Sequence, residues 1–298
     1  MNEVTNATGM TAGKVTALIV AGLMVAMAAV TVLGLKGPRT SEFVRCVTPA
    51  SLVGDLHSSS GMREVAQMLV GSAEHSSLYW EDQVAFLKYN VEGSQEWNRG
   101  YTGGIIGFTS RTASMLELVR RYDALRPGNP LSPFLPALAA VDGTSSMKGL
   151  GPDFEQAWSA AAGDPLFLQA QLGLATDWYL NPALEQAATD GLRAFGQFAY
   201  YDAMIHHGSS GFEMIRQDAL QTTAPPADGG NETTWLQAWL DAREAYMTQE
   251  VSDITATRVT TAQQGLLDAG ELDLRAPLAW DIYGDHFRIQ VAPFCSLW

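Results

Sequence analysis

The first pattern along the chain is an uninterrupted apolar run over residues 15–35, which contains 21 residues and no charged side chain. This length is sufficient to cross a bilayer and exceeds the apolar core of most signal peptides. The run predicts either an uncleaved signal anchor or a signal peptide. Both alternatives make the rest of the chain extracellular or membrane-anchored outside the cytoplasm. We interpret residues 1–14 as an N-terminal tail and residues 36–60, which contain Gly-Pro and Ser clusters, as a linker.

Hydrophobic positions spaced three and four apart recur over most of residues 61–298, which predicts one helix-rich domain. Val65, Met68 and Leu69 show this spacing in the first helix, over residues 63–73. Residues 101–109 are instead rich in glycine, aromatic and β-branched residues, and they predict a short strand or hairpin. The other predicted helices span residues 113–125, 153–162, 164–178, 183–207, 212–221, 234–251 and 255–269. The expected fold class is mainly α (α+β), with one small β-sheet near the start of the domain.

Three charged residues interrupt apolar helix faces. Asp202 lies within an aromatic and aliphatic stretch, and Arg243 continues a face that carries two tryptophans at steps of four. Arg258 precedes apolar positions of the next helix on the same face. Because a buried charge costs several kcal/mol unless it is paired, we expect these three side chains to meet in one network. Such a network either only holds the helices together or orients a catalytic carboxylate and sets its pKa.

Composition and charge limit the classes of function. Of the 298 residues, 47% are hydrophobic and 9% are aromatic, which excludes intrinsic disorder. The formal net charge is -14, and residues 61–298 carry 14 basic against 29 acidic side chains. This field repels phosphate backbones, so we expect no nucleic-acid partner. It would attract a cationic substrate, although many secreted proteins are acidic for solubility alone.

The chain contains two cysteines, which are too few for a disulfide framework. Cys46 and Cys295 lie near the two ends of the exported part, where they either form one bridge that ties the termini together or remain free thiols.

Several other motifs do not support a function. The Gly-rich segment 100–107 lacks the Lys-Ser/Thr pair of a phosphate-binding loop. His206 and His207 are adjacent, so on a helix they point about 100° apart and do not favour a shared metal. Segment 208–211 is one residue short of a nucleophile elbow and follows a helix where a strand is required. We therefore expect neither a metal nor an organic cofactor.

Three carboxylates stand at or after the end of the first helix. Glu74 stands at that end, while Glu92 and Glu96 precede the predicted strand. An acid at the end of a helix, facing carboxylates on a following loop and sheet, is a recurring arrangement for glycoside cleavage. One acid protonates the leaving oxygen, and the other activates water or attacks the sugar.

The residues around these carboxylates carry a family resemblance. Residues 72–80 read SAEHSSLYW and residues 99–108 read RGYTGGIIGF. Further matching segments are residues 115–119, 127–129, 190–194, 196–203, 232–234, 240–243, 272–274 and 283–285. With these segments in this order, the sequence resembles the bacterial chitosanases of glycoside hydrolase family 46 over residues 62–289. Residues 1–60 and the tail from Gln290 lie outside the resemblance.

This resemblance implies an inverting endo-hydrolase of chitosan, a polymer of β-1,4-linked glucosamine, with a two-lobed, lysozyme-like, mainly helical fold. The implied partners are chitosan or glucosamine oligomers. They would be bound by a monomer that contacts a membrane only through residues 15–35. Glu74 corresponds to the general acid of the family, and Thr102 to the residue that positions the attacking water.

The resemblance also assigns the residues around the acid. Asp202, Arg243 and Arg258 correspond to a buried ion network behind it, as the apolar faces predict independently. Arg99, Glu250 and His207 correspond to substrate-binding positions.

The sequence departs from the family at the general base, which is an aspartate in an Asp-Gly-Arg-Gly-Tyr stretch. Here the corresponding residues 92–101 are about five residues longer. Counting forward from Glu74 places the base at Glu92, and counting back from Tyr101 leaves Glu96 as the nearest carboxylate. We favour Glu92 slightly. Ser114 and Lys88 also stand where acids are usual in the family. The alternatives are a chitosan-binding homologue with impaired catalysis, or a hydrolase of partly acetylated chitin or peptidoglycan sugars.

Overall fold

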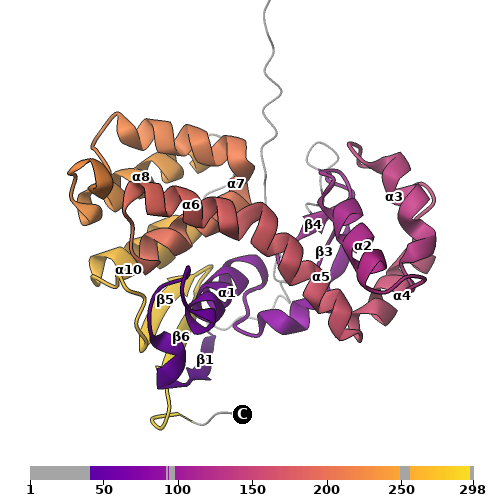
Figure 1. Ribbon diagram of the computed structural model, residues 1–298, viewed down its shortest axis with the longest axis horizontal. Helices are drawn as coiled ribbons and strands as arrows, with labels where there is room; N and C mark the ends of the chain where they lie inside the picture. Colours follow the sequence, from indigo (N-terminus) through magenta and orange to yellow (C-terminus); the bar gives the residue numbers. More distant parts are fainter. Residues whose placement is uncertain (1–40, 92, 94–97, 249–255, 296–298) are drawn as a thin grey trace, which may run out of the picture.

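The computed structural model describes residues 41–91, 93, 98–248 and 256–295, which form two lobes (Figure 1). The first lobe combines helices from both ends of the domain with a three-stranded sheet of order β1-β6-β5. Its helices are α1 (Ser60–His75), α7 (Ala194–Leu220), α8 (Glu232–Thr248) and α10 (Gln264–Asp268), with short turns η1 (Pro49–Leu52) and η5 (Pro226–Asp228). Its strands are β1 (Glu42–Val47), β5 (Leu278–Ile282) and β6 (Asp285–Val291).

The second lobe is formed by the middle of the chain around a three-stranded antiparallel sheet of order β2-β3-β4. Its strands are β2 (Leu87–Tyr89), β3 (Tyr101–Gly103) and β4 (Phe108–Thr109). Its helices are α2 (Ser114–Leu125), α3 (Leu135–Val141) and α4 (Pro152–Ala162), with short turns η2 (Trp80–Ala85) and η3 (Ser132–Phe134). The aromatic core of this lobe brings Trp158 within 4.9 Å of Phe167, measured between ring centroids.

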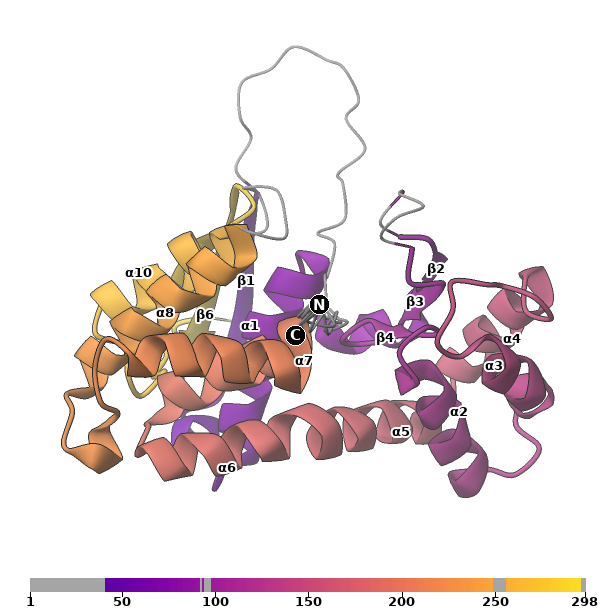
Figure 2. The ribbon, with the colours of Figure 1, turned by 90° about the horizontal axis from the view of Figure 1, so that it is seen from above.

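A continuous helical rod joins the two lobes. It consists of α5 (Pro165–Ala175), the π-helical turn η4 (Thr176–Leu180) and α6 (Asn181–Asp190). It crosses from one lobe to the other in Figure 1 and runs along one side of the molecule in Figure 2. The carboxylate of Asp164 caps its start by accepting the N–H of Leu166. Gly191, with φ of 78°, ends α6 in the left-handed conformation. The rod packs on α2 at one end and on α7 at the other.

Most of the predicted helices are confirmed in approximate position, but α3 was not predicted, and the boundary near residue 191 differs. The sequence pattern predicted one helix over residues 183–207, whereas α6 ends at Asp190 and α7 begins at Ala194. The predicted break at Gly208 is confirmed, because the backbone there is non-helical (φ 66°, ψ 178°) and separates α7 into two helical segments. Apolar positions continue through residues 190–194, so their spacing does not mark the break between α6 and α7.

The expected small sheet is present as β2-β3-β4, but the first lobe contains a second sheet that was not predicted. Residues 42–52, which were expected to belong to a linker, form β1 and η1 instead. Residues 42–47 form β1, which pairs in parallel with β6 from Glu42 opposite His286 to Val47 opposite Val291. Phe43 stacks on Phe287 with ring centroids 4.9 Å apart, so this strand is packed and not a spacer. The pairing is invisible in a local pattern, because the partner strand lies more than 200 residues away.

Cys46 and Cys295 form a disulfide, which resolves the two alternatives for the cysteines. The bond lies beside the end of the parallel β1–β6 pair and joins the two ends of the domain covalently. The apolar run over residues 15–35 lies outside the described residues. Among the described residues, none of the helices combines the length and the apolar character that a membrane span requires.

Candidate active site

Glu74 lies in the last turn of α1, where the helix meets the second lobe. The predicted apolar positions of this helix, including Val65, Met68 and Leu69, are buried as expected. Ser76 ends the helix in the left-handed conformation (φ 49°), and its N–H donates to the carbonyl of Gly71. The Glu74 side chain is only 2% exposed. The end of α1 therefore holds a carboxyl group in the interior between the two lobes.

The predicted network of Asp202, Arg243 and Arg258 is present, and it reaches Glu74. Asp202 forms one ion pair with Arg243 at 2.8 Å and another with Arg258 at 3.2 Å. Arg258 also pairs with Glu74 through its Nη2. All four residues are at most 7% exposed. When Glu74 is ionised, two anions and two cations neutralise one another inside the protein, as buried charges require; when Glu74 is protonated, the cluster carries one net positive charge.

Burial is the largest influence on Glu74 and raises the pKa of its carboxyl above the ordinary value. The cations of Arg258 and Arg99 oppose this shift, and the charge of Asp202 adds to it. A carboxyl group with a raised pKa keeps its proton at a pH where an exposed glutamate has lost it. Glu74 therefore has the property that a general acid needs.

Two histidines of α7 complete the network as hydrogen-bond acceptors. Arg258 donates to Nδ1 of His206, and Arg243 donates through Nε to Nε2 of His207 at 3.1 Å. Burial, followed by the adjacent arginines, lowers the pKa of both imidazoles well below the ordinary value, so both are neutral. His207 is 2% exposed and packs on Tyr246. The ring therefore lies between Arg243 and Tyr246, and its expected contact with substrate stays a prediction.

Gln263 connects the charged groups further. Its amide N–H donates to Oδ2 of Asp202 at 2.8 Å, and its carbonyl accepts from Arg243 at 3.2 Å. Arg258 and Gln263 are the first and last residues of the π-helical turn η6 (Arg258–Gln263). The i→i+5 register of a π-helix brings these two residues to one side, whereas an α-helix would align Arg258 with Ala262.

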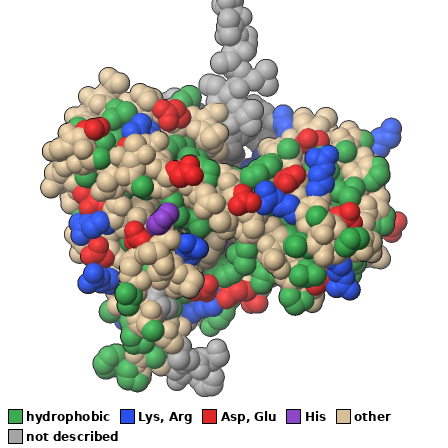
Figure 3. All heavy atoms as spheres, viewed as in Figure 1, with side chains coloured by type: hydrophobic (Ala, Val, Ile, Leu, Met, Phe, Trp, Pro, Cys, Tyr) green, Lys and Arg blue, Asp and Glu red, His purple; other side chains and the backbone are tan. Residues whose placement is uncertain are grey.

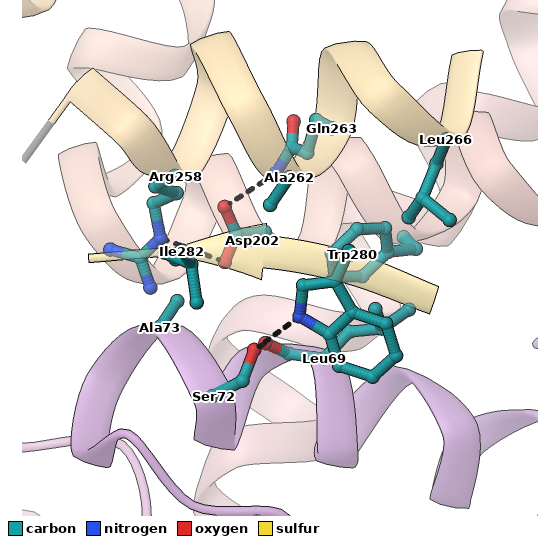
Figure 4. A pocket seen from close by; sticks show the side chains of 11 residues that line it. Leu69, Ser72, Ala73, Asp202, Arg258, Ala262, Gln263, Leu266, Trp280 and Ile282 are labelled. Carbon is teal, nitrogen blue, oxygen red and sulfur yellow. Dashed lines mark hydrogen bonds and ion pairs between the residues drawn. The ribbon is translucent and has the colours of Figure 1, made fainter. Parts of the chain in front are cut away.

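A small cavity lies on the side of Asp202 and Arg258 that faces α1 and β5 (Figure 4). Its volume for the centre of a water-sized molecule is about 10 Å³, comparable to the space that one water needs. Apart from the polar groups of Ser72 and Gln263, the other lining side chains are apolar, and Nε1 of Trp280 donates to Ser72 across it. The ion pairs therefore lie in a poorly hydrated interior and depend on their protein partners.

Thr102 occupies the middle of β3, opposite Lys88 on β2 and Thr109 on β4. It is 3% exposed, and its hydroxyl has no hydrogen-bond partner among the described residues. The turn after β3 contacts the end of α1, where Nε2 of His75 lies 3.2 Å from the carbonyl of Ile105. A buried hydroxyl without a partner is uncommon and is suited to hold a water molecule. Lys88 is exposed.

The candidates for the general base, Glu92 and Glu96, lie outside the described residues, and so does Glu250. Strands β2 and β3, which precede and follow the two candidates Glu92 and Glu96 along the chain, are joined by hydrogen bonds. The N–H of Asn90 donates to the carbonyl of Gly100 at 2.9 Å, which closes the hairpin of β2 and β3. Asn98 is 2% exposed and donates from its amide to the hydroxyl of Tyr89 at 3.1 Å. Asn90 and Asn98 are therefore both anchored by hydrogen bonds at the β2–β3 hairpin that carries Thr102.

The charge of Arg99 affects the acid and two of its neighbours: it acts to lower the pKa of Glu74, His206 and Tyr179. Tyr179 comes from the π-helical turn η4, and burial raises the pKa of its phenol. Ser114, in contrast, is 1% exposed, and its hydroxyl accepts the N–H of Thr109 at 2.9 Å. Its hydroxyl is thus engaged in the turn that starts α2.

The described residues contain no group of three or more His, Cys, Asp or Glu side chains placed to hold a metal ion. Two network members were missed in the sequence, His206 and Gln263. His206 follows Asp202 by four residues, so helical spacing alone could have placed it on the same face. Gln263 carried no such signal, because the π-helical register of its turn departs from that spacing.

A buried acid with a raised pKa ends α1 beside the turn of a small sheet, and within the described residues the hydroxyl of Thr102 on this sheet has no partner. This fold and site together define a glycoside hydrolase. The chain belongs to glycosyl hydrolase family 46, whose family model matches residues 68–278.

Comparisons with individual proteins agree with the family. A chitosanase of Streptomyces sp. (strain N174) is 48% identical over 232 residues, which cover 76% of this chain and 82% of the relative. The structure of a chitosanase with substrate superposes with a TM-score of 0.73 at 44% identity, covering 78% of this chain and 98% of that one. The chitosanase of Gynuella sunshinyii in complex with chitotetraose gives a TM-score of 0.69 at 30% identity, over 77% and 98% of the two chains. The lysozyme-like α+β class expected from the resemblance is thereby confirmed.

Proposed function

We propose that this protein is an endo-acting chitosanase, which hydrolyses β-1,4 linkages between glucosamine units with inversion at the anomeric carbon. The observation that carries the proposal is the Glu74 carboxyl, which is 2% exposed and held by Arg258 in a buried network. Membership of glycosyl hydrolase family 46 and the chitosanases at 48% and 44% identity support the substrate class.

In the proposed reaction, Glu74 donates its proton to the glycosidic oxygen as the bond to the anomeric carbon breaks. Glu92 or Glu96 removes a proton from the attacking water, which the hydroxyl of Thr102 helps to hold. An inverting reaction places this base on the opposite face of the sugar from the acid. The arginine pair and Asp202 keep the Glu74 carboxyl in one position, so little reorganisation is needed when the proton is transferred.

The proposed ligand is a polycation, since glucosamine units carry amines. Arg99 and Glu250 are the proposed substrate contacts. On the face shown in Figure 3, acidic side chains are mixed with Lys and Arg over both lobes and do not gather in one patch. The net charge of -14 therefore attracts chitosan in general, while individual carboxylates near Glu74 select the glucosamine units. We place the enzyme outside the cytoplasm, secreted or held at a membrane through residues 15–35.

Release of reducing ends from soluble chitosan tests the proposal. We expect activity in the wild type and a loss of about 10²–10⁴ in kcat for Glu74→Gln, as for other general acids. Glu117→Gln is the matched control, because Glu117 forms a surface ion pair with Arg121 on α2. NMR of the initial product should show the inverted anomer. A wild type that binds glucosamine oligomers without cleaving them would make the protein a binding homologue.

The base is assigned by the pair Glu92→Gln and Glu96→Gln. We expect Glu92→Gln to lose most of the activity. Full activity in that variant together with its loss in Glu96→Gln would transfer the role to Glu96.

A further inference from the structure

The side chain of Arg45 ties three segments of the chain together. It donates through Nη1 to the carbonyl of Leu78 at 2.6 Å and to one oxygen of Glu81 at 2.8 Å. Its Nη2 donates to the other oxygen of Glu81 at 2.5 Å and lies 3.2 Å from a carboxylate oxygen of Glu64. The guanidinium carbon also lies 5.2 Å from the ring centroid of Tyr79. Such a fork geometry fixes both position and orientation.

Arg45 belongs to an element that the family match does not include. It lies in the middle of β1, whereas the match begins at residue 68. The neighbouring Cys46 carries the disulfide to Cys295, and β1 is paired with β6 along its whole length. The base of the Arg45 side chain is therefore fixed by a sheet and a covalent bond.

The segment that Arg45 holds is the one that ends the helix of Glu74. The N–H of Ser77 donates to the carbonyl of Gly71 at 3.3 Å, which folds the chain back on α1. A Cβ at Gly71 would lie 2.8 Å from the carbonyl oxygen of Ser77, so helix and segment are in close contact. Leu78 is 1% exposed. Movement of this segment would therefore be transmitted to the last turn of α1.

Charge at this point makes the segment dependent on one cation. The carboxylate of Glu64, on α1, accepts a hydrogen bond from Nε1 of Trp80 at 3.1 Å. It also pairs with the guanidinium of Arg45, as Glu81 does. Without Arg45 the carboxylates of Glu64 and Glu81 would repel each other, and the carbonyl of Leu78 would lose its donor. Both effects push the segment away from α1. The side chain of Arg45 is only 20% exposed, so solvent screens these interactions less than it screens a surface pair.

We propose that Arg45 is a positioning residue for the catalytic acid: it fixes residues 78–81 and, through them, the end of α1 that carries Glu74. This inference rests on the proposed role of Glu74 as general acid. The N-terminal strand β1 thus supports the site from outside the segment matched by the family model.

Arg45→Met is the test, with Arg288→Met as the matched control. Arg288 belongs to the same sheet and pairs with Glu42 of β1 at 3.3 Å, but its pair with Glu42 is away from residues 78–81. For Arg45→Met we expect kcat on soluble chitosan to fall about tenfold with little change in KM, since a displacement of the acid affects the chemical step. The control should stay within about twofold of the wild type, a range typical of surface changes.

The pH profile separates positioning from stability alone. A loosened helix end admits water to Glu74, and because burial is what raises the pKa of this carboxyl, its pKa should fall. The acid must be protonated to act, so the alkaline limb of kcat should move to lower pH in Arg45→Met only. Equal kcat values and pH profiles for Arg45→Met and Arg288→Met, with a difference only in Tm, would overturn the proposal.

A second variant and a second measurement keep the test independent of folding and of turnover. Arg45→Lys retains the cation, but one ammonium cannot serve the carbonyl of Leu78 and both oxygens of Glu81 at once. We expect a several-fold lower kcat, and an unchanged kcat and pH profile in this variant would also overturn the proposal. NMR titration of Glu74 in ¹³C-glutamate-labelled protein reports its pKa without substrate. If the wild type does not cleave chitosan, this titration still tests the link from Arg45 to Glu74.

Discussion

Replacing Asp202 by Asn tests whether the four buried charges work as one neutral unit. The substitution keeps the size of the side chain and its hydrogen bond with Gln263, but it removes one of two negative charges. Arg243 and Arg258, which are 0% and 1% exposed, then face Glu74 alone. The interior is left with one uncompensated positive charge.

The cost follows from the distances. Asp202 lies 2.8 Å and 3.2 Å from the two arginines. At an effective dielectric constant of 20, charges about 3 Å apart attract by about 5–6 kcal/mol. Part of this loss is offset, because burying a neutral amide costs less desolvation free energy than burying a carboxylate. We expect a net loss of about 3–5 kcal/mol in the free energy of unfolding, as for other broken buried ion pairs. In a domain of this size the Tm should fall by about 6–20 °C.

Urea denaturation and thermal melts measure this loss. Asp177→Asn is the matched control, since Asp177 also pairs with an arginine, at 2.6 Å, but its side chain is 54% exposed. A surface pair of this kind contributes at most about 1 kcal/mol. Adding Arg243→Met to Asp202→Asn restores neutrality, so the double variant should lose less than the sum of the two single losses. If Asp202→Asn is no less stable than the control, the charges are not coupled as described.

Three further predictions concern the acid's surroundings. Thr102→Val should lower kcat about tenfold or more, because it removes the hydroxyl proposed to hold the attacking water. Its Tm should be unchanged or higher, because this hydroxyl has no partner among the described residues. A lower Tm with normal kcat would contradict this. Gly71→Ala should cost about 1–3 kcal/mol in denaturant unfolding, because its Cβ would lie 2.8 Å from the carbonyl oxygen of Ser77, and a cost below about 0.5 kcal/mol would show that the helix end yields. Burial lowers the pKa of His75 to about 4, so the unfolded chain takes up this proton first, near pH 6.5. Stability should therefore be complete above about pH 6.5 and decline by up to about 3 kcal/mol towards pH 4. His75→Gln should reduce that decline, and the exposed His57→Gln should not.

The charged network was the part of the site most accessible from sequence. Asp202 and Arg243 stand on faces that are otherwise aromatic and aliphatic, and burial makes a partner obligatory for each. The cost of burying an unpaired charge therefore predicted that these side chains meet, although helical spacing could not predict which atoms pair. Gln263 escaped because the turn that carries it has a π-helical register. His207 was expected to contact substrate, which stays a prediction, and its hydrogen bond with Arg243 was not foreseen.

The first-lobe sheet was not predictable in the same way. β1 pairs with a strand at the far end of the chain, so its stability comes from Phe287 and its neighbours and not from its own residues. Exposed, intermediate and buried positions follow one another in β1 without strict alternation, which gives a weak strand signal. A disulfide between Cys46 and Cys295 was one of two open alternatives, because connectivity depends on this same long-range pairing.

The bond between Cys46 and Cys295 makes the domain a covalently closed ring, since the two cysteines are 249 residues apart and enclose both lobes and the catalytic acid. One proteolytic cut in any surface loop between them opens the ring without releasing a fragment. The two pieces remain joined through sulfur and packed on each other. A nicked enzyme would thus migrate as a single chain until a reductant is added.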